Sequence, residues 1–190
     1  QRMTKRIMDV VLCLIAMVPA SVIMLITAIF IKLDDGGPVF FRQERVTRNG
    51  KHFNVIKFRS MIVDAEKYNK PIPAVDQDPR ITKVGRIIRA TRIDELPQLF
   101  NILKGDMSIV GPRPERVEHV EKYSREIPEF IYREKVKGGL TGYAQIYGRY
   151  NTSAYDKLRL DLMYIEDYSL VLDIKMIFRT IRILFQKDST

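Results

Sequence analysis

Residues 91–114, TRIDELPQLFNILKGDMSIVGPRP, place two adjacent carboxylates at the start of an apolar stretch that has helical spacing. If Asp94 is the N-cap, Pro97 falls at N3, where a proline removes no intrahelical hydrogen bond. Thr91 is a rival N-cap, which would put Asp94 at N3 in a capping box and Pro97 in the second turn. In both cases Asp94 and Glu95 lie at the positive end of the helix dipole, which favours their ionised forms.

The composition indicates an anionic partner. The 190 residues include 32 Lys and Arg against 23 Asp and Glu, a net charge of +9. This surplus suits nucleic acid, acidic lipid or a phosphorylated substrate. The single cysteine, Cys13, excludes an intramolecular disulfide, and two histidines without a Cys/His cluster argue against structural zinc. The first residue is Gln1 rather than Met, which is compatible with a longer parent protein.

Residues 10–31 form an apolar segment of 22 positions without a charge. At 1.5 Å per residue, this segment makes about 33 Å of helix, enough to cross a bilayer. A signal peptide fits poorly because the run is too long and lacks a cleavage site. A buried helix of a soluble core is the other alternative, although so long an uncharged run favours a membrane segment. We therefore predict a membrane anchor over residues 1–32 and a cytoplasmic domain over residues 33–190.

The path of the anchor is a separate question. Pro19 lies near the middle of the apolar segment, and Ser21 follows it. A proline there bends the helix and frees a carbonyl, which a nearby hydroxyl can satisfy. Positive flanks tend to stay cytoplasmic, so a straight span must export one basic flank whereas a bent, re-entrant helix exports neither. The flanking basic residues are Arg2, Lys5, Arg6, Lys32, Arg42, Arg45 and Arg48.

Residues 38–59 are predicted to form a β-hairpin. Two β-rich runs flank Arg48-Asn49-Gly50-Lys51, and Asn-Gly is the strongest short hairpin signal. Most of this hairpin is expected to be purely structural, but Lys57 and Arg59 near its end are able to reach an anionic ligand.

A surface loop is predicted for residues 69–80, where three prolines and several turn formers cluster. Residues 81–92 then form a short amphipathic helix whose basic side leads into Asp94. A solvated charged face is the ordinary interpretation of such a helix, whereas four basic residues before a carboxylate pair suggest contact with a phosphate or a lipid headgroup. Those basic residues are Lys83, Arg86, Arg89 and Arg92.

The C-terminal half is predicted to be mainly helical. Gly105 should end the helix that follows Asp94. Residues 114–137 suggest a helix followed by a loop, and residues 138–150, with four glycines and three tyrosines, suggest an irregular loop packed near a site. The tail from Tyr155 is helical, and its second half is amphipathic. It fits a core helix with solvated basic residues and a helix lying in the membrane interface equally well.

Several stretches together resemble one family, the bacterial sugar transferases, or monotopic phosphoglycosyl transferases. The matching pieces are KRIMDVV, GPVFFRQERVTRNGKHFNVIKFRSM, DPRITKVGRIIRATRIDELPQLFNILKGDMSIVGPRP, GGLTGYAQIYGRYN and DLMYIEDYSLVLDIKMI, in that order. They cover nearly the whole chain, and the run from the Asp-Glu pair to Pro-Arg-Pro is highly specific. Arg92-Ile93 departs from the Ser or Thr followed by Leu that is common before the pair.

This resemblance implies an α+β, mostly helical fold. It has a re-entrant, helix-break-helix anchor broken near Pro19, a small β-hairpin, and amphipathic interfacial helices around an active site at the membrane surface. It also implies a location on the cytoplasmic face of the bacterial inner membrane, as a monotopic protein, with a possible homodimer and no nucleic-acid partner.

The same resemblance implies transfer of a sugar 1-phosphate from a UDP-sugar to undecaprenyl phosphate, with release of UMP, as the first membrane step of exopolysaccharide, capsule or O-antigen assembly. Glucose and galactose are the favoured sugars. Asp94 would be the covalent nucleophile beside Glu95, both would hold Mg²⁺, and Arg89 and Arg113 would bind phosphate, as would Arg59.

Physical chemistry supports these roles, because a diphosphate repels an anionic nucleophile until metal and arginine neutralise its charge. Glu95 would hold the metal or move a proton. Direct attack by the lipid phosphate is a variant within the same enzyme class. A non-catalytic membrane module that binds anionic lipid or nucleic acid is the alternative class. It leaves the carboxylate pair beside a basic helix unexplained.

Overall fold

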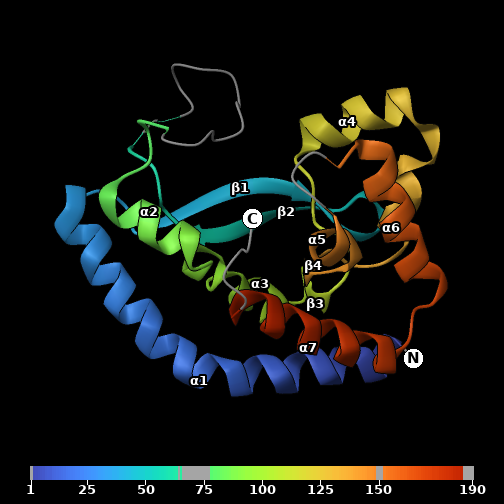
Figure 1. Ribbon diagram of the computed structural model, residues 1–190, viewed down its shortest axis with the longest axis horizontal. Coiled ribbons are helices and arrows are strands. Elements are labelled where there is room, and N and C mark those ends of the chain that lie inside the picture. Colours follow the sequence, from blue (N-terminus) through green and yellow to red (C-terminus); the bar gives the residue numbers. More distant parts are fainter. Residues whose placement is uncertain (1, 64, 66–77, 149–151, 186–190) are drawn as a thin grey trace. The chain divides into compact units, whose positions relative to one another are not determined.

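The protein is described by a computed structural model for residues 2–63, 65, 78–148 and 152–185. The elements, with 3₁₀ turns written η, are α1 (Arg2–Asp35), β1 (Phe40–Val46), η1 (Arg48–Gly50), β2 (His52–Phe58), α2 (Lys83–Ala90), η2 (Ile93–Glu95), α3 (Gln98–Lys104), β3 (Ser108–Val110), α4 (Val117–Glu126), η3 (Pro128–Lys135), β4 (Gly139–Thr141), α5 (Tyr143–Tyr147), α6 (Ala154–Glu166) and α7 (Leu170–Phe185) (Figure 1). The expected mostly helical α+β class is confirmed.

The chain divides into two compact units that each combine distant stretches of sequence. The first unit comprises Gln1–Cys13, Gln43–Val55 and Phe100–Thr190, and the second comprises Leu14–Arg42 and Ile56–Leu99. The predicted boundary between anchor and cytoplasmic domain at residue 32 concerns membrane insertion. It stays a prediction.

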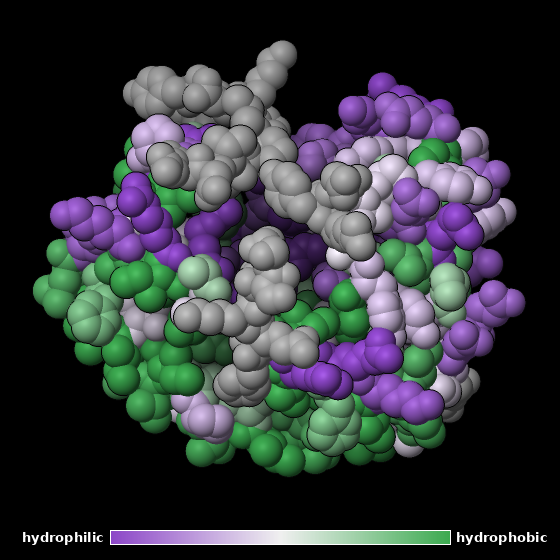
Figure 2. All heavy atoms as spheres, in the orientation of Figure 1, coloured by the Kyte–Doolittle hydropathy of each residue, from purple (hydrophilic) through white to green (hydrophobic). Residues whose placement is uncertain are grey.

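Helix α1 is one helical element with Pro19 inside it. It is long and apolar enough to cross a membrane, and only 22% of its most apolar window is buried. Apolar atoms accordingly line the edge of Figure 2 along which α1 runs in Figure 1, whereas hydrophilic atoms cover α4. The Ser21 hydroxyl donates to the Val18 carbonyl at 2.8 Å, whereas the carbonyl that Pro19 deprives of its i+4 donor is that of Ile15. Helix α1 continues on both sides of Pro19, and the re-entrant path stays a prediction.

The predicted hairpin is confirmed. Strands β1 and β2 pair in a two-stranded sheet, joined through η1. Asn49 and Gly50 have φ of +59° and +69°, the left-handed conformations that make Asn-Gly favourable in tight hairpin turns. The rings of Phe40 and Phe58 stack with centroids 5.5 Å apart.

The first unit is built around a short parallel sheet. Strand β3 pairs with β4 in the register Ser108 to Gly139 and Val110 to Thr141. A Cβ at Gly139 would lie 2.1 Å from the backbone nitrogen of Gly111, so no larger residue fits. The core next to this sheet consists of Val110, Tyr164 and Met176, which come from β3, α6 and α7. Residues 138–148, predicted to be an irregular loop, therefore include β4 and the short helix α5, and that prediction was wrong in this respect.

Buried charges attach the start of α1 to this core. Lys5 Nζ donates to Asp173 Oδ2 at 2.6 Å, and the Tyr164 hydroxyl donates to Asp173 Oδ1 at 2.8 Å. The Asp9 carboxylate accepts from Ser108 Oγ at 2.8 Å and from the Ile109 backbone N–H at 3.1 Å. Burial raises the pKa of Asp173, whereas the Lys5 ammonium opposes that rise. The KRIMD stretch thus has a structural role in the fold.

The second unit positions α2 against the end of the hairpin. Thr82 caps the helix, its hydroxyl accepting from the Gly85 N–H at 2.9 Å. A Cβ at Gly85 would lie 2.0 Å from the Ser60 carbonyl oxygen, so only glycine permits this approach. The predicted loop at 69–80 falls mostly outside the described residues.

Candidate active site

The carboxylate pair lies in η2, one turn before α3. This finding corrects the predicted cap: α3 begins at Gln98, so neither Asp94 nor Thr91 is its N-cap, and Pro97 precedes the helix instead of occupying N3. Thr91 is instead the C-cap of α2. The end of α3 is as predicted, because Gly105 follows it with φ +94° and its N–H donates to the Asn101 carbonyl.

A left-handed residue sets the turn that presents the pair. Arg92 has φ +59° and ψ 12°, a conformation that costs energy for a residue with a side chain. Its carbonyl accepts from the Glu95 N–H at 3.1 Å, which closes the turn. Strain of this kind is frequent at functional sites, where the surrounding structure maintains it. No local sequence pattern indicated it, because arginine has no preference for this region.

Glu95 is paired with Lys57 from the end of β2. Lys57 Nζ donates to Glu95 Oε1 at 2.7 Å, and both side chains are largely buried. The sequence marked Lys57 only as able to reach an anion. Its partner, 38 residues away, was not identifiable without the hairpin.

Asp94 has a different environment. Its side chain is half-buried and, among the described residues, makes no hydrogen bond or ion pair. Burial raises the pKa of Asp94, Lys57 opposes the rise, the neighbouring Glu95 carboxylate adds to it, and Arg89 and Arg92 oppose it. Burial thus acts against the effect of the helix dipole that was expected at this position. An ionised Asp94 is a desolvated carboxylate that gains from any added cation.

The predicted phosphate-binding residues fall in different surroundings. Arg89, in the last turn of α2, is close enough to lower the pKa of Asp94, so the structure brings these two together. Arg59 is engaged elsewhere: its guanidinium pairs with Asp35 and donates to the carbonyls of Pro38 and Met61 at 2.6 and 2.9 Å. Arg59 thus has a structural role at the end of α1, and binding a phosphate would require giving up these contacts.

Arg113 belongs to the first unit, where a buried ion pair supports its backbone. Arg133 Nη2 donates to the Arg113 carbonyl at 2.9 Å and to Asp161 Oδ2 at 2.7 Å. The Arg133 and Asp161 side chains are 6% and 1% exposed. Neither residue was singled out from the sequence. The catalytic and phosphate-binding roles of Asp94, Glu95, Arg89, Arg59 and Arg113 stay predictions.

The Asp94-Glu95 pair also fits the predicted magnesium ion. Mg²⁺ is typically held by one or two carboxylates together with substrate phosphates and water. No group of three or more His, Cys, Asp or Glu side chains that could hold a metal ion occurs in the described part of the chain. Asp94, half-buried and without a hydrogen bond or ion pair in the part of the chain that the structure describes, has the donor chemistry that such a cation needs.

Comparison with known proteins shows the class to which this fold and carboxylate pair belong. The bacterial sugar transferase family matches residues 1–187. The chain belongs to that family.

Several curated relatives cover nearly all of the chain. It is 46% identical over 181 residues to the UDP-N-acetylgalactosamine-undecaprenyl-phosphate N-acetylgalactosaminephosphotransferase of Aeromonas hydrophila. The alignment covers 94% of this chain and 43% of the relative. Identity is 45% to the UDP-glucose:undecaprenyl-phosphate glucose-1-phosphate transferase of Klebsiella pneumoniae, covering 93% of this chain and 39% of the relative. The UDP-glucose:undecaprenyl-phosphate glucose-1-phosphate transferase of Caulobacter vibrioides is 41% identical over 192 residues, an alignment that covers 97% of this chain and 71% of the relative. The chain thus spans about two fifths of the first two relatives.

Proposed function

We propose that this chain is the catalytic part of a phosphoglycosyl transferase that moves a sugar 1-phosphate from a UDP-sugar to undecaprenyl phosphate and releases UMP. The observation that supports it most is the half-buried Asp94, unpartnered among the described residues, beside a Lys57-Glu95 ion pair and within electrostatic reach of Arg89. The names of the relatives agree with this chemistry, and they differ in the sugar.

The proposed reaction has two displacements at one phosphorus atom. An ionised Asp94 oxygen attacks the phosphorus that bears the sugar, the bond to the bridging oxygen breaks, and UMP leaves with that electron pair. A phosphate oxygen of the lipid then attacks the same phosphorus and displaces the Asp94 carboxylate, which restores the enzyme. Lys57 keeps Glu95 in place, and Arg89 adds positive charge where the diphosphate must approach.

Mg²⁺ is part of this proposal, and Asp94 and Glu95 are the residues that would hold it. The bound ion would supply charge neutralisation of the diphosphate. Lys57, which already donates to Glu95 at 2.7 Å, would keep that carboxylate oriented in the free enzyme.

We further propose that α1 anchors the chain in the cytoplasmic face of the bacterial inner membrane as a re-entrant helix, with α7 in the interface. Helix α7 supports this, because Asp173 and Met176 face the core while an apolar row stays exposed at positions 171, 174, 178 and 181. Cysteines at Met3 and Gly36, in a Cys13→Ser background, should both react with a membrane-impermeant maleimide from the cytoplasmic side. Reaction of the two from opposite sides would establish a straight span.

The activity is tested by UMP release from a panel of UDP-glucose, UDP-galactose and their N-acetylated counterparts, in nanodiscs that contain undecaprenyl phosphate. We expect release with at least one sugar, abolished by a chelator and restored by Mg²⁺. With UDP-sugar alone, mass spectrometry should find a phosphosugar adduct on Asp94. An active enzyme without this adduct would use direct attack by the lipid, and no release with any sugar would favour a non-catalytic lipid-binding module.

A further inference from the structure

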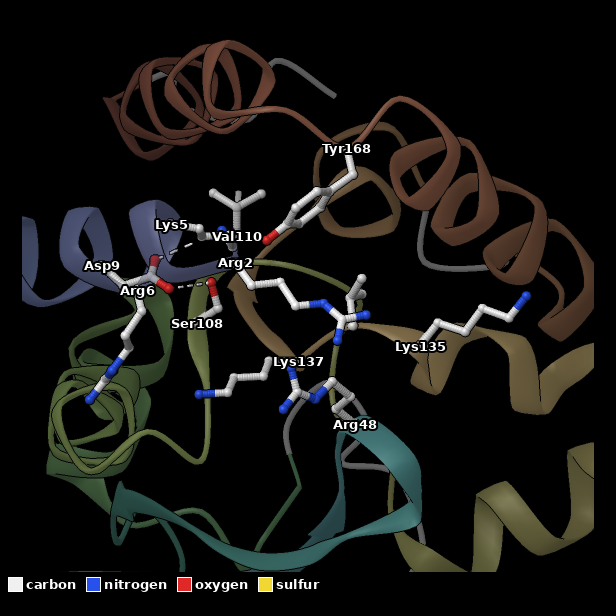
Figure 3. Close-up of a pocket in the computed structure, with 11 residues that line it drawn as sticks. Arg2, Lys5, Arg6, Asp9, Arg48, Ser108, Val110, Lys135, Lys137 and Tyr168 are labelled. Carbon is white, nitrogen blue, oxygen red and sulfur yellow. Dashed lines mark hydrogen bonds and ion pairs between the residues drawn. The ribbon is translucent and has the colours of Figure 1, made fainter.

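A second cationic site lies in the first unit, at the start of α1. A cavity of about 50 Å³ is lined there by six basic side chains and one carboxylate, Asp9. The basic residues come from α1, η1 and the segment around the end of η3, and they are Arg2, Lys5, Arg6, Arg48, Lys135 and Lys137 (Figure 3). The strands and helices of one unit thus bring together cations that are far apart in the sequence.

The acidic groups at this site are already satisfied. Asp9 accepts from Ser108 and Ile109 and lies 3.8 Å from Lys5 Nζ, while Lys5 itself donates to Asp173. These contacts neutralise Lys5 and use the oxygens of Asp9. Asp9 is the one carboxylate among the six basic residues that line the cavity, so the lining keeps a surplus of positive charge.

Three cations remain available for a ligand. Arg2, Arg48 and Lys137 make no ion pair with a carboxylate within the ranges that the structure describes. Arg6 donates to the carbonyls of Ile102 and Leu103, which are polar but uncharged, so its positive charge also persists. Figure 3 shows Arg2, Arg48 and Lys137 entering from α1, from η1 and from the segment before β4.

The crowding of positive charges affects the pKa of Lys137. Burial lowers the pKa of Lys137, and the positive charges of Arg6 and Arg48 lower it further, whereas Asp9 and Asp106 oppose the shift. An anion in the cavity would relieve this repulsion and favour the charged lysine. The cavity volume suits a single phosphate group and is far below that of a pocket for a nucleotide-sized ligand.

The position of the cavity indicates which phosphate. The uncharged run of α1 begins at Val10, and Met3 and Ile7, on the same helical turns as the cavity residues, are 78% and 59% exposed. If α1 inserts as proposed above, this cavity lies at the level of the lipid headgroups. Basic pockets at that level on the cytoplasmic side bind anionic lipids.

We propose that the cavity between Arg2, Arg48 and Lys137 binds the phosphate headgroup of an anionic phospholipid and thereby fixes the start of α1 at the membrane surface. This proposal rests on one part of the proposed function, the insertion of α1 in the membrane, and does not depend on the catalytic activity.

The test measures lipid retention. Wild-type protein is placed in phosphatidylcholine nanodiscs with a minority of phosphatidylglycerol, released, and analysed by native mass spectrometry. We expect the wild type to retain phosphatidylglycerol. The double variant Arg48→Gln/Lys137→Gln should retain at least about tenfold less of it, because each basic residue adds to the attraction. The matched control is Lys122→Gln/Arg125→Gln, two exposed residues of α4, which removes the same net charge and should retain the lipid. Equal loss in both variants, or equal retention, would overturn the site.

Two further arms identify the anion and keep the test independent of folding. Inorganic phosphate or undecaprenyl phosphate is added as a competitor at the same concentration as phosphatidylglycerol. Neither competitor should displace the bound phosphatidylglycerol, and displacement by either would overturn the phospholipid assignment. The wild-type melting temperature should rise with the phosphatidylglycerol fraction, and that of the double variant or of Arg2→Gln should not. UMP release is measured in the same discs, so a failed transferase assay and a failed lipid site give different results.

Discussion

Asp173 and Asp94 are both shielded carboxylates with raised pKa values, yet their partners differ. Asp173 is fully buried and receives hydrogen bonds from Lys5 and Tyr164, so its charge is matched within the fold. Asp94 is half-buried, and its neighbours Lys57 and Arg89 act on it without a hydrogen bond from either among the described residues. The first arrangement stabilises the structure, whereas the second leaves a reactive group for an added cation and a phosphate.

The first prediction concerns Asp94 itself. Asp94→Asn should reduce UMP release by at least about 10³-fold and abolish the adduct, because a neutral amide cannot form the acyl phosphate. Burial raises the folded-state pKa of Asp94, so its ionisation costs stability as the pH rises through that pKa, and the variant should melt higher than wild type at pH 7. The difference should vanish at acidic pH, where Asp94 is protonated in both states. The exposed Glu121→Gln serves as control; unchanged activity in Asp94→Asn would remove Asp94 from the mechanism.

The partnered carboxylates predict a loss of stability instead. Asp161→Asn should destabilise the protein by about 3 kcal/mol, because it leaves the Arg133 charge buried without its counter-ion. Chemical denaturation measures this. The exposed pair of Glu44 and His52 is the matched comparison, and Glu44→Gln should change stability by no more than about 0.5 kcal/mol. Similar effects of the two substitutions would contradict the contrast between buried and exposed pairs.

Lys57 connects the two kinds of environment, because it pairs with Glu95 and also opposes the raised pKa of Asp94. Lys57→Met should lower the rate of UMP release at neutral pH by about tenfold or more. The acidic limb of the pH–rate profile should move to higher pH, because Asp94 then loses a proton less easily. Lys57→Arg should restore the position of that limb. A uniform loss of rate without a shift would mean that Lys57 acts only through the fold.

The smallest effect is expected at the cap of α2, the helix that carries Arg89. Thr82→Ala removes the acceptor of the Gly85 N–H and should cost about 1 kcal/mol of unfolding free energy. Thr82→Ser should keep most of the wild-type unfolding free energy, because its hydroxyl can accept the same hydrogen bond. UMP release by Thr82→Ala at low temperature should stay close to wild type, since the helix remains folded there. A loss larger than that of Asp161→Asn would place α2, rather than the buried ion pairs, at the centre of stability.

Local chemistry was sufficient to predict much of the backbone. The hairpin at Asn49-Gly50, the helix end at Gly105 and the long apolar helix follow from the conformational freedom of single residues and from an uncharged run. The carboxylate pair was also evident. Its conformation was not, because the turn at Arg92 depends on how α2 ends, and α2 is placed by the contact of Gly85 with Ser60 and by the bond from the Val84 N–H to Asp34.

The sequence by itself determined which chemical groups this protein has: a membrane-length apolar helix, adjacent carboxylates, a surplus of basic residues and the family motifs. Only the tertiary structure decided which charges neutralise one another, because Lys5 and Asp173 are 168 positions apart, and Arg59 is committed to Asp35. The physical reason is that charge pairing depends on distance in space and on burial, neither of which local sequence encodes. The same contacts leave Asp94, Arg48 and Lys137 as the charged groups to test.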